Sequence, residues 1–310
     1  MKSISILLLS LLNLTSGCGQ ILIPEWKVTV QVVDEANRPE PGADAEVWYS
    51  APPRRGSSVG HDKVVGRTDT NGLFTASGRS QFDLVYSARK AGFYTSTKSL
   101  ELGFTEKKRH EPWNPTLKLM LKKIGKPIPM YAKATRSNVG EAGRAFGYDL
   151  TVGDWVAPKG NGVSTDILFT AQLDKRAEND FDYKLVVSFP NQGDGIQPFS
   201  ITELEKTSAL RSPHEAPEGG YQPEWIKSQS RRPGEPAVNP LDESLNFFFR
   251  VRTVLDEKGN VKSALYGKIY GDFMNFRYYL NPEPNSRNME FDPRRNLLKV
   301  PRGEPVVQDP

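Results

Sequence analysis

The chain has 310 residues, a formal net charge of +4, and a high content of proline (24) and glycine (26). So many turn-forming residues disfavour long helices, while the length allows two domains of ordinary size. Basic and acidic residues nearly balance at 41 and 37, without a long basic run, which argues against a nucleic-acid partner. A single cysteine excludes an intrachain disulfide.

The first residues have the form of an export signal. Met1-Lys2 is a short basic start, and the apolar run from Ile4 to Leu14 is too short to span a bilayer. The run leads into Ser16-Gly17-Cys18, which resembles a bacterial lipoprotein signal, although Thr15 stands where that pattern has leucine. The resemblance implies lipidation of Cys18 and a lipid anchor in the cell envelope, with the outer membrane favoured over the inner. The alternative is a plain secretory signal, which would make the protein secreted.

Beyond the signal, the sequence predicts a run of short strands. From Trp26 to Val32 apolar and polar residues alternate, which is the period of a half-buried strand. Residues 37–42 hold two prolines and a glycine and predict a turn, after which the alternation resumes from Ala43 to Tyr49. Residues 68–72 predict a second turn, in which Asp69 bonds nearby backbone amides.

These motifs resemble the carboxypeptidase regulatory-like domain, a transthyretin-like sandwich related to the collagen-adhesin B-type repeat. The matching stretches are V-T-V-Q-V-V-D, P-G-A-D-A-E-V, T-D-T-N-G-L-F and the later Lys90-Ala91-Gly92-Phe93-Tyr94. The chain departs from the family in an insert at 51–62 and a loop at 110–115. The resemblance implies a seven-stranded scaffold module without catalytic residues of its own.

The fold class expected for the whole chain is all-β, with that N-terminal sandwich followed by a second β-rich domain with long loops. The expected segments are a signal peptide at 1–17, a tether at 18–25, the sandwich at 26–124, a linker at 125–130, the β-rich domain at 131–300 and a tail at 301–310. Because Gly125 to Pro129 is a short, stiff joint, we expect the two domains to pack against each other.

Several parts of the second half of the chain have weaker secondary-structure patterns. Strands are expected at 166–173 and 183–189, joined by an acidic loop from Asp174 to Asp182. Residues 190–243 are rich in proline and lack a clear period, apart from one short helix expected at 203–210. From Tyr278 onwards we expect a looped, polar tail that wraps the domain.

The strongest signal in the second half is a hairpin formed by residues 245–255 and 260–273 around Asp256-Glu257-Lys258-Gly259. Pairing Asp256 with Asn260 sets the register and gives an apolar face made by the odd-numbered residues. The other face then mixes aromatic rings with cations, in the cross-strand pairs Arg250–Tyr266, Phe248–Lys268 and Asn246–Tyr270.

The sequence predicts no metal or cofactor site. The three histidines (His61, His110 and His214) have no ligand spacing, and Pro217 breaks the zinc-protease pattern that His214-Glu215 begins. Asp149 and Asp154 are the tempting carboxylate pair for a polysaccharide hydrolase, but turn-capping aspartates are the favoured interpretation. No catalytic residue is therefore assigned.

An aromatic surface is the candidate ligand site. Sugar rings stack on tryptophan and tyrosine while amides and cations bind the hydroxyls. The candidate residues are Trp155, Tyr221, Trp225, Asn246, Arg250, Tyr266, Lys268 and Tyr270. The competing interpretation places these rings in the core or beneath residues 190–243.

The second half also resembles a group of secreted bacterial proteins through G-D-W-V-A-P, D-G-I-Q-P-F, F-F-R-V-R-T-V-L-D and L-Y-G-K-I-Y-G-D-F, a resemblance that implies no mechanism. The leading hypothesis is a non-enzymatic, membrane-anchored envelope protein that binds an extracellular ligand, with a glycan as the favoured class. The alternatives are a structural subunit that docks another envelope protein and a polysaccharide-active hydrolase.

Overall fold

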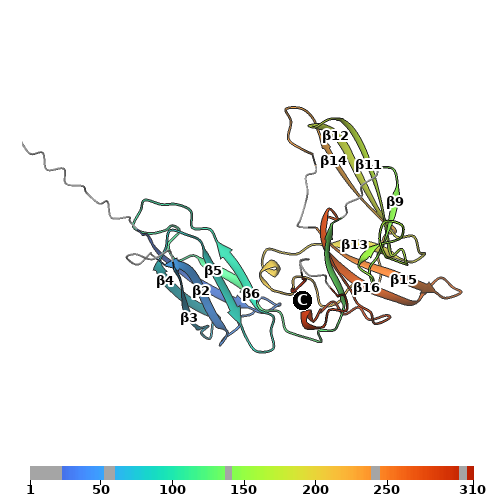
Figure 1. Ribbon diagram of the computed structural model, residues 1–310. Coiled ribbons are helices and arrows are strands. Elements are labelled where there is room, and N and C mark those ends of the chain that lie inside the picture. Colours follow the sequence, from blue (N-terminus) through green and yellow to red (C-terminus); the bar gives the residue numbers. More distant parts are fainter. Residues whose placement is uncertain (1–22, 52–59, 137–141, 239–244, 300–305) are drawn as a thin grey trace, which may run out of the picture.

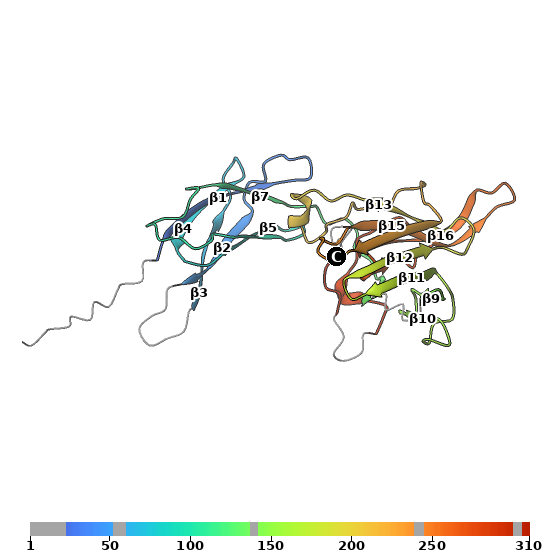
Figure 2. The ribbon, with the colours of Figure 1, turned by 90° about the horizontal axis from the view of Figure 1, so that it is seen from above.

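The computed structural model describes residues 23–51, 60–136, 142–238, 245–299 and 306–310. The signal peptide at 1–17 and Cys18 lie outside these described residues. Two β-rich bodies lie next to each other along one long axis, with the early strands in one and the late strands in the other (Figures 1 and 2). Within the described ranges, no helix has the length and apolar character needed to cross a membrane.

The N-terminal body is a sandwich of a three-stranded sheet, ordered β4-β1-β7, and a four-stranded sheet, ordered β3-β2-β5-β6. Its strands are β1 (Glu25–Val33), β2 (Asp44–Ala51), β3 (Gly60–Arg67), β4 (Leu73–Arg79), β5 (Leu84–Arg89), β6 (Ser96–Leu100) and β7 (Thr116–Met120). The seven strands confirm the predicted all-β scaffold.

Alternation along the sequence explains this first core. Trp26, Val28, Val30 and Val32 of β1 are at most 1% exposed, and they pack against Val47 and its neighbours from the facing sheet. The turn between β3 and β4 is held by Asp69, whose Oδ1 accepts hydrogen bonds from the amides of Asn71 and Leu73. The alternation of apolar and polar residues and the turn-forming residues therefore place these strands where the sequence predicts them.

The C-terminal body is a second sandwich with two five-stranded sheets, ordered β10-β9-β11-β12-β14 and β13-β15-β16-β17-β8. Its elements, including two 3₁₀ turns η1 and η2, are β8 (Tyr131–Arg136), β9 (Ala145–Asp149), β10 (Asp154–Trp155), β11 (Ile167–Ala177), β12 (Asp180–Ser188), β13 (Gly195–Phe199), η1 (Glu205–Thr207), β14 (Glu224–Arg231), β15 (Asn246–Leu255), β16 (Val261–Gly271), β17 (Asn275–Leu280) and η2 (Pro293–Arg295).

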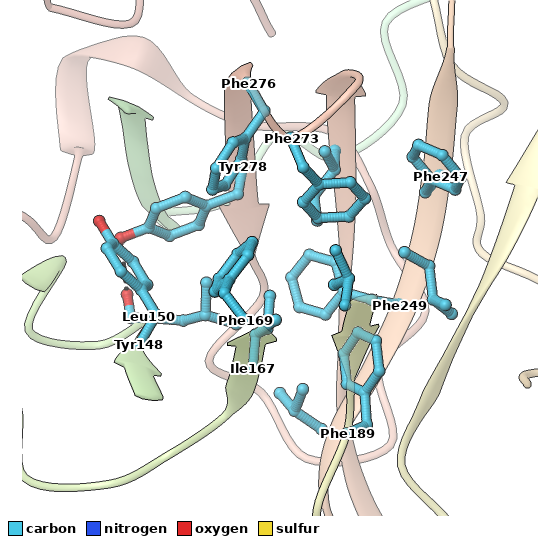
Figure 3. Close-up of a cluster of buried hydrophobic side chains, with 14 of the residues drawn as sticks. Tyr148, Leu150, Ile167, Phe169, Phe189, Phe247, Phe249, Phe273, Phe276 and Tyr278 are labelled. Carbon is cyan, nitrogen blue, oxygen red and sulfur yellow. Dashed lines mark hydrogen bonds between the residues drawn. The ribbon is translucent and has the colours of Figure 1, made fainter. Parts of the chain in front are cut away.

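An aromatic core fills the space between these two sheets (Figure 3). The rings of Phe169, Phe247, Phe249, Phe273 and Tyr278 are all fully buried there. Phe169 meets Phe273 edge-to-face with centroids 5.9 Å apart, an arrangement that aromatic pairs favour. Burial of this many rings gives the second sandwich a hydrophobic core of its own.

The predicted hairpin register is confirmed. Asn246 pairs with Tyr270, Phe248 with Lys268 and Arg250 with Tyr266. Gly259 adopts φ +82° in the turn, where glycine is free of the steric cost of a side chain. The sequence did not predict the irregularity after Val251, where Arg252 has φ +55° and the pairing shifts.

Other elements of the second sandwich differ from expectation. The acidic segment is not a loop, because β11 and β12 continue as a ladder in which Asp174 pairs with Asp182. Residues 190–243 contain the strands β13 and β14, and the short helix expected at 203–210 is the single turn η1. The segment from Tyr278 begins inside strand β17, and the loop-like part of the chain starts only after Leu280.

The two sandwiches contact each other directly through the region around η1 and the loops beside it. Met120 N donates to Thr207 Oγ1 at 3.0 Å, and Ala209 N donates to the Thr95 carbonyl at 2.9 Å. The buried Lys122 Nζ donates to the Ser212 carbonyl at 3.1 Å. These contacts agree with the packing expected from the short linker.

Candidate functional site

The eight candidate residues do not form one surface. Trp155 and Trp225 pack against the aromatic core of the second sandwich. Trp225 lies with its ring centroid 5.1 Å from that of Phe247, and Lys159 Nζ lies 3.9 Å from the centroid of Trp155. Both side chains are only half-buried and pack on one side against the core, so their role as rings that stack on a sugar stays a prediction.

Asn246, Lys268 and Tyr270 lie on the predicted polar face, but this face is covered. They are 4%, 0% and 4% exposed. The Tyr270 hydroxyl accepts a 3.1 Å hydrogen bond from Ser212 N, while Lys268 Nζ donates to Ser212 Oγ at 3.2 Å and to the Pro310 carbonyl at 3.1 Å. Segments far apart in the sequence therefore cover these side chains and separate them from any ligand.

Burial also governs the chemistry of Lys268. Desolvation, reinforced by the nearby Arg211 cation, lowers the pKa of the Lys268 ammonium well below its ordinary value. Lys268 Nζ lies 4.8 Å from the ring centroid of Tyr279 and 5.4 Å from that of Tyr270, so aromatic faces partly replace water. Lys268 is thus a structural group of the core.

The remaining three candidates, Tyr221, Arg250 and Tyr266, do come together on the outer side of β15 and β16. The ring centroids of Tyr221 and Tyr266 lie 6.0 Å apart, and the Arg250 guanidinium carbon lies 5.0 Å from the Tyr221 centroid. Arg250 is fixed in place by a 2.8 Å hydrogen bond from Nε to the Gly193 carbonyl. Three of the eight predicted residues therefore belong to one site.

A polar groove of about 490 Å³ adjoins this trio, and we call it the Tyr266 groove. It runs between the tip of the β15–β16 hairpin and the loops before β14 and after β17. The residues that line it are Glu218, Gly259, Asn260, Val261, Tyr266, Asn285 and Arg287.

Tyr266 provides the floor of the groove. Its side chain packs in a small apolar cluster with Ala216, Phe248 and Met289 and is only 5% exposed. Within the described parts of the chain its hydroxyl has no hydrogen-bond partner, and Tyr266 is one of the residues that line the groove. A rigid ring with an open hydroxyl is a preorganised hydrogen-bonding group.

The rim of the groove carries one charge of each sign. Arg287 donates from Nη1 to the Ala216 carbonyl at 2.8 Å and lies 3.5 Å from the exposed carboxylate of Glu215. Glu218 is exposed and forms no ion pair with the residues that the structure describes. The groove therefore presents a carboxylate acceptor and a guanidinium donor over a hydroxyl, a combination suited to a ligand rich in hydroxyl groups.

Sequence reasoning did not find Glu218, Asn285 or Arg287 as groove residues. They lie on irregular loops that come to the hairpin only through the fold, so no spacing rule connects them. The one available signal was the predicted register, which places Tyr266 next to Arg250 on the non-core face. That register identifies the floor of the groove but not its rim.

The carboxylate pair considered for hydrolysis has a structural role. Asp149 Oδ1 accepts from the amides of Thr151 and Val152 at 3.0 and 3.1 Å. Its Oδ2 accepts from the amides of Val163 and Ser164 at 3.1 and 3.0 Å. Burial opposes ionisation, but these bonds outweigh it and lower the pKa of Asp149 to about 2.

Asp154 is bound in the same way, because its carboxylate accepts from the amides of Trp155 and Asn161, and its pKa also lies below the ordinary value. A hydrolase would need one of the two carboxyl groups to stay protonated near neutral pH. The arrangement instead matches the turn-capping interpretation.

The residues the structure describes hold no cluster of three or more histidine, cysteine or acidic side chains that could bind a metal ion. His61 lies on the exposed strand β3, and His110 is buried with Nε2 2.8 Å from the Ser80 carbonyl oxygen. His214 lies at the contact between the two sandwiches, with a carboxylate on each side of its ring.

No protein-family model and no curated protein match the chain. Solved structures with partial likeness include a hydroxyquinol 1,2-dioxygenase from Pseudomonas putida DLL-E4, at 12% identity and a TM-score of 0.26, covering 33% of this chain and 57% of the dioxygenase.

The shaft pilin spaA from Lactobacillus rhamnosus GG is similar at 15% identity and a TM-score of 0.24, with 55% of this chain and 89% of the pilin covered. A candidate carbohydrate-binding protein from Bacteroides uniformis ATCC 8492 has 11% identity and a TM-score of 0.19, with 85% and 99% covered. All these TM-scores are below 0.5, so the likenesses carry no argument about function.

Proposed function

We propose that the chain is a non-enzymatic, lipid-anchored protein of the bacterial cell envelope that binds a glycan in the Tyr266 groove. The observation that carries the proposal is the open hydroxyl of Tyr266, on a ring that is only 5% exposed, at the floor of a polar groove. Glu218 and Arg287 supply an acceptor and a donor above it. Sites that fix a ligand's orientation use a small number of such placed polar groups.

The mode of binding differs from simple stacking. The Tyr266 ring is buried, and the Arg250 guanidinium carbon lies 5.0 Å from the Tyr221 centroid, so the protein's own groups already occupy part of both rings. Recognition in the groove therefore depends on hydrogen bonds to sugar hydroxyls. Because each bond to a neutral partner contributes about 0.5–1.5 kcal/mol, removal of one group is expected to weaken binding by roughly 2- to 10-fold.

The test is a polysaccharide-binding screen with the exported chain carrying Cys18→Ser, followed by affinity measurements on the best ligand. Tyr266→Phe removes only the hydroxyl and Glu218→Gln removes only the charge, and both are expected to weaken binding. Tyr279→Phe is the matched control, because the Tyr279 hydroxyl also has no hydrogen-bond partner among the described residues but is buried, and Tyr279 does not line the groove. Equal binding by all four proteins would place the ligand elsewhere.

The anchor is tested separately. In a bacterial host with lipoprotein processing, the natural chain is expected to incorporate labelled palmitate and to sediment with the membranes. Cys18→Ala is expected to do neither. A natural chain that stays unlabelled and is released from the cell would leave the plain secretory signal as the explanation.

The protein-docking alternative predicts a large exposed apolar patch. On the outer face of the sheet β3-β2-β5-β6, Trp48 and Val85 are exposed cross-strand neighbours. However, Lys63 lies 4.5 Å from the Trp48 centroid and also pairs with Glu46 at 3.1 Å. This mixture of charge and apolar surface is typical of a solvated face, so the groove is the better-supported site.

A further inference from the structure

The contact between the two sandwiches is centred on the carboxylate of Glu290, whose side chain is 5% exposed. Its Oε2 accepts from the Tyr94 hydroxyl at 2.6 Å and from Gly125 N at 2.9 Å. Its Oε1 faces His214 Nδ1 at 2.8 Å. The C-terminal sandwich thus presents a buried carboxylate to a tyrosine of the N-terminal sandwich, to the linker and to a histidine.

The other nitrogen of His214 faces the opposite body. His214 Nε2 lies 3.2 Å from Glu35 Oε1, and Glu35 belongs to the turn that follows β1 in the N-terminal sandwich. An ionised carboxylate only accepts hydrogen bonds, so both ring nitrogens have to donate for this geometry to be satisfied. This geometry is therefore fully satisfied when the ring is an imidazolium cation.

The surrounding charges support the same conclusion. The bond to Glu290 raises the pKa of His214, and Glu35 adds to this effect, while burial opposes it. Burial alone would raise the pKa of Glu290, but the bonds from His214, Tyr94 and Gly125 lower it to about 2. Glu290 is therefore ionised at any physiological pH.

The other charged groups near this contact interact with the partners of His214 rather than with its ring. Lys122 lies in the field of Glu35 and Glu205, and its ammonium is 3.6 Å from the Glu205 carboxylate. The charge of Asp292 raises the pKa of the Tyr94 phenol. Glu290 raises this pKa both by its charge and by accepting a hydrogen bond from the phenol. His214 is thus the group in this set that changes charge near neutral pH.

We propose that His214 is a pH-sensitive clamp that fastens the two sandwiches together while protonated and releases the Glu35 side as the pH rises. Loss of one proton leaves a ring with one donor and one acceptor. The buried Glu290 retains the donor at Nδ1, so Nε2 becomes an acceptor that faces the Glu35 carboxylate. The attractive contact between His214 and Glu35 becomes a repulsive one, while the Tyr94–Glu290 bond and the contacts around η1 remain and serve as the hinge.

The direction of the pH dependence follows from the linkage between protonation of His214 and stability of the contact. A group whose pKa is raised in the folded protein contributes its full stabilisation below its ordinary value, here 6.5. That contribution is lost as the pH rises through the raised value. The clamp is consequently closed in mildly acidic surroundings and open in alkaline ones.

The experiment follows protonation and domain arrangement on the same full chain. Long-range ¹H–¹⁵N spectra resolve the ring nitrogens, and with three histidines in the chain a His214→Gln variant assigns the signal. We expect both nitrogens of His214 to be protonated at pH 6 and the midpoint to lie above 6.5. Small-angle X-ray scattering on the same samples is expected to show a larger radius of gyration above that midpoint.

Variants separate the clamp from other alkaline effects. His214→Gln is expected to show the larger radius already at pH 6 and to lose the change near the midpoint. Glu35→Gln, at an exposed position, is expected to move the midpoint down because it removes the carboxylate charge that faces Nε2. His61→Gln is the matched control and keeps the natural behaviour. A midpoint at or below 6.5, or a radius that changes identically in His214→Gln, overturns the proposal.

Discussion

The phenol of Tyr94 in the N-terminal sandwich donates a 2.6 Å hydrogen bond to Glu290 Oε2 in the C-terminal sandwich, across 196 positions of sequence. Hydrogen bonds to charged groups contribute about 1.5–3 kcal/mol, and those that are made in a buried contact are screened little by water. This bond is consequently a defined fastening point between two bodies that each have their own core.

Tyr94→Phe is expected to weaken the contact by about 1.5 kcal/mol, at the low end of that range, because Glu290 keeps its donors from His214 and Gly125. Denaturant unfolding is the measurement, with the loss of coupling seen as an earlier first transition. Tyr86→Phe is the control, since the Tyr86 hydroxyl has no hydrogen bond to any residue the structure describes. Equal stability of the Tyr94 variant and the natural chain would contradict the prediction.

Acid is expected to loosen the same contact through Glu290. Its pKa falls from 4.5 to about 2, and each unit corresponds to about 1.4 kcal/mol, which gives roughly 3 kcal/mol. Because the folded-state pKa is depressed, this stabilisation is present above pH 4.5 and is lost as the pH falls towards 2. Unfolding free energy measured between pH 6 and pH 2.5 tests the expectation.

Asp149 titrates in the same acidic range, since its pKa is also about 2, so one curve alone does not isolate Glu290. Glu290→Gln provides the separation. This variant is expected to be less stable at pH 6 and to show a smaller decrease on acidification. Parallel curves for the variant and the natural chain would assign the acid sensitivity to other carboxylates.

How far the sequence predicts this fold depends on the kind of strand. Strand β1 and the β15–β16 hairpin were predicted with the correct faces, because alternating apolar residues and a glycine turn fix the register. Strands β13 and β14 were not predicted, because they are sheet-edge strands with little alternation; β13 is also short, and Pro198 lies inside it. Tertiary pairing rather than local pattern decides those elements.

The candidate site shows the same limit. The register correctly placed Tyr266 and Lys268 on one face, but it could not show that other segments bury Lys268 and leave Tyr266 beside a groove. Likewise, His214 had no partner within its own stretch, and its two carboxylates lie 76 and 179 positions away. Residues brought together over such separations leave no spacing signal in a single sequence.

Gly267 on β16 is expected to be intolerant of even a methyl group. A Cβ at this position would lie 2.1 Å from Phe249 Cζ and 2.4 Å from the Tyr279 carbonyl oxygen. The ring belongs to a closely packed core and the carbonyl is backbone, so neither moves without cost. Gly267→Ala is therefore expected to destabilise the second sandwich by at least about 2 kcal/mol in thermal or denaturant unfolding.

Gly219→Ala serves as the comparison for this measurement, because a Cβ there meets no atom within 4 Å. It is expected to change the free energy of unfolding by less than about 0.5 kcal/mol. If both alanine variants unfold together with the natural chain, the packing around Phe249 is looser than the structure shows.

Asp149→Asn distinguishes a structural carboxylate from a catalytic one. The Asp149 carboxylate accepts four backbone amides and also receives Arg252 Nη2 at 3.2 Å, and an asparagine supplies one oxygen in place of two. Its NH₂ group would then face other donors. We expect a loss of about 1–3 kcal/mol in unfolding free energy, with glycan affinity in the Tyr266 groove unchanged well below the melting temperature.

Asp154→Asn is the milder partner of this variant, because Asp154 is less buried and holds a shorter turn. A hydrolase that uses the two carboxylates predicts the reverse pattern, in which both variants keep their stability and lose polysaccharide cleavage. Unfolding curves and a reducing-sugar assay on the natural chain and both variants therefore decide the matter. Cleavage by the natural chain that disappears in a fully stable Asp149→Asn protein would reinstate the hydrolase and displace the capping role derived from the structure.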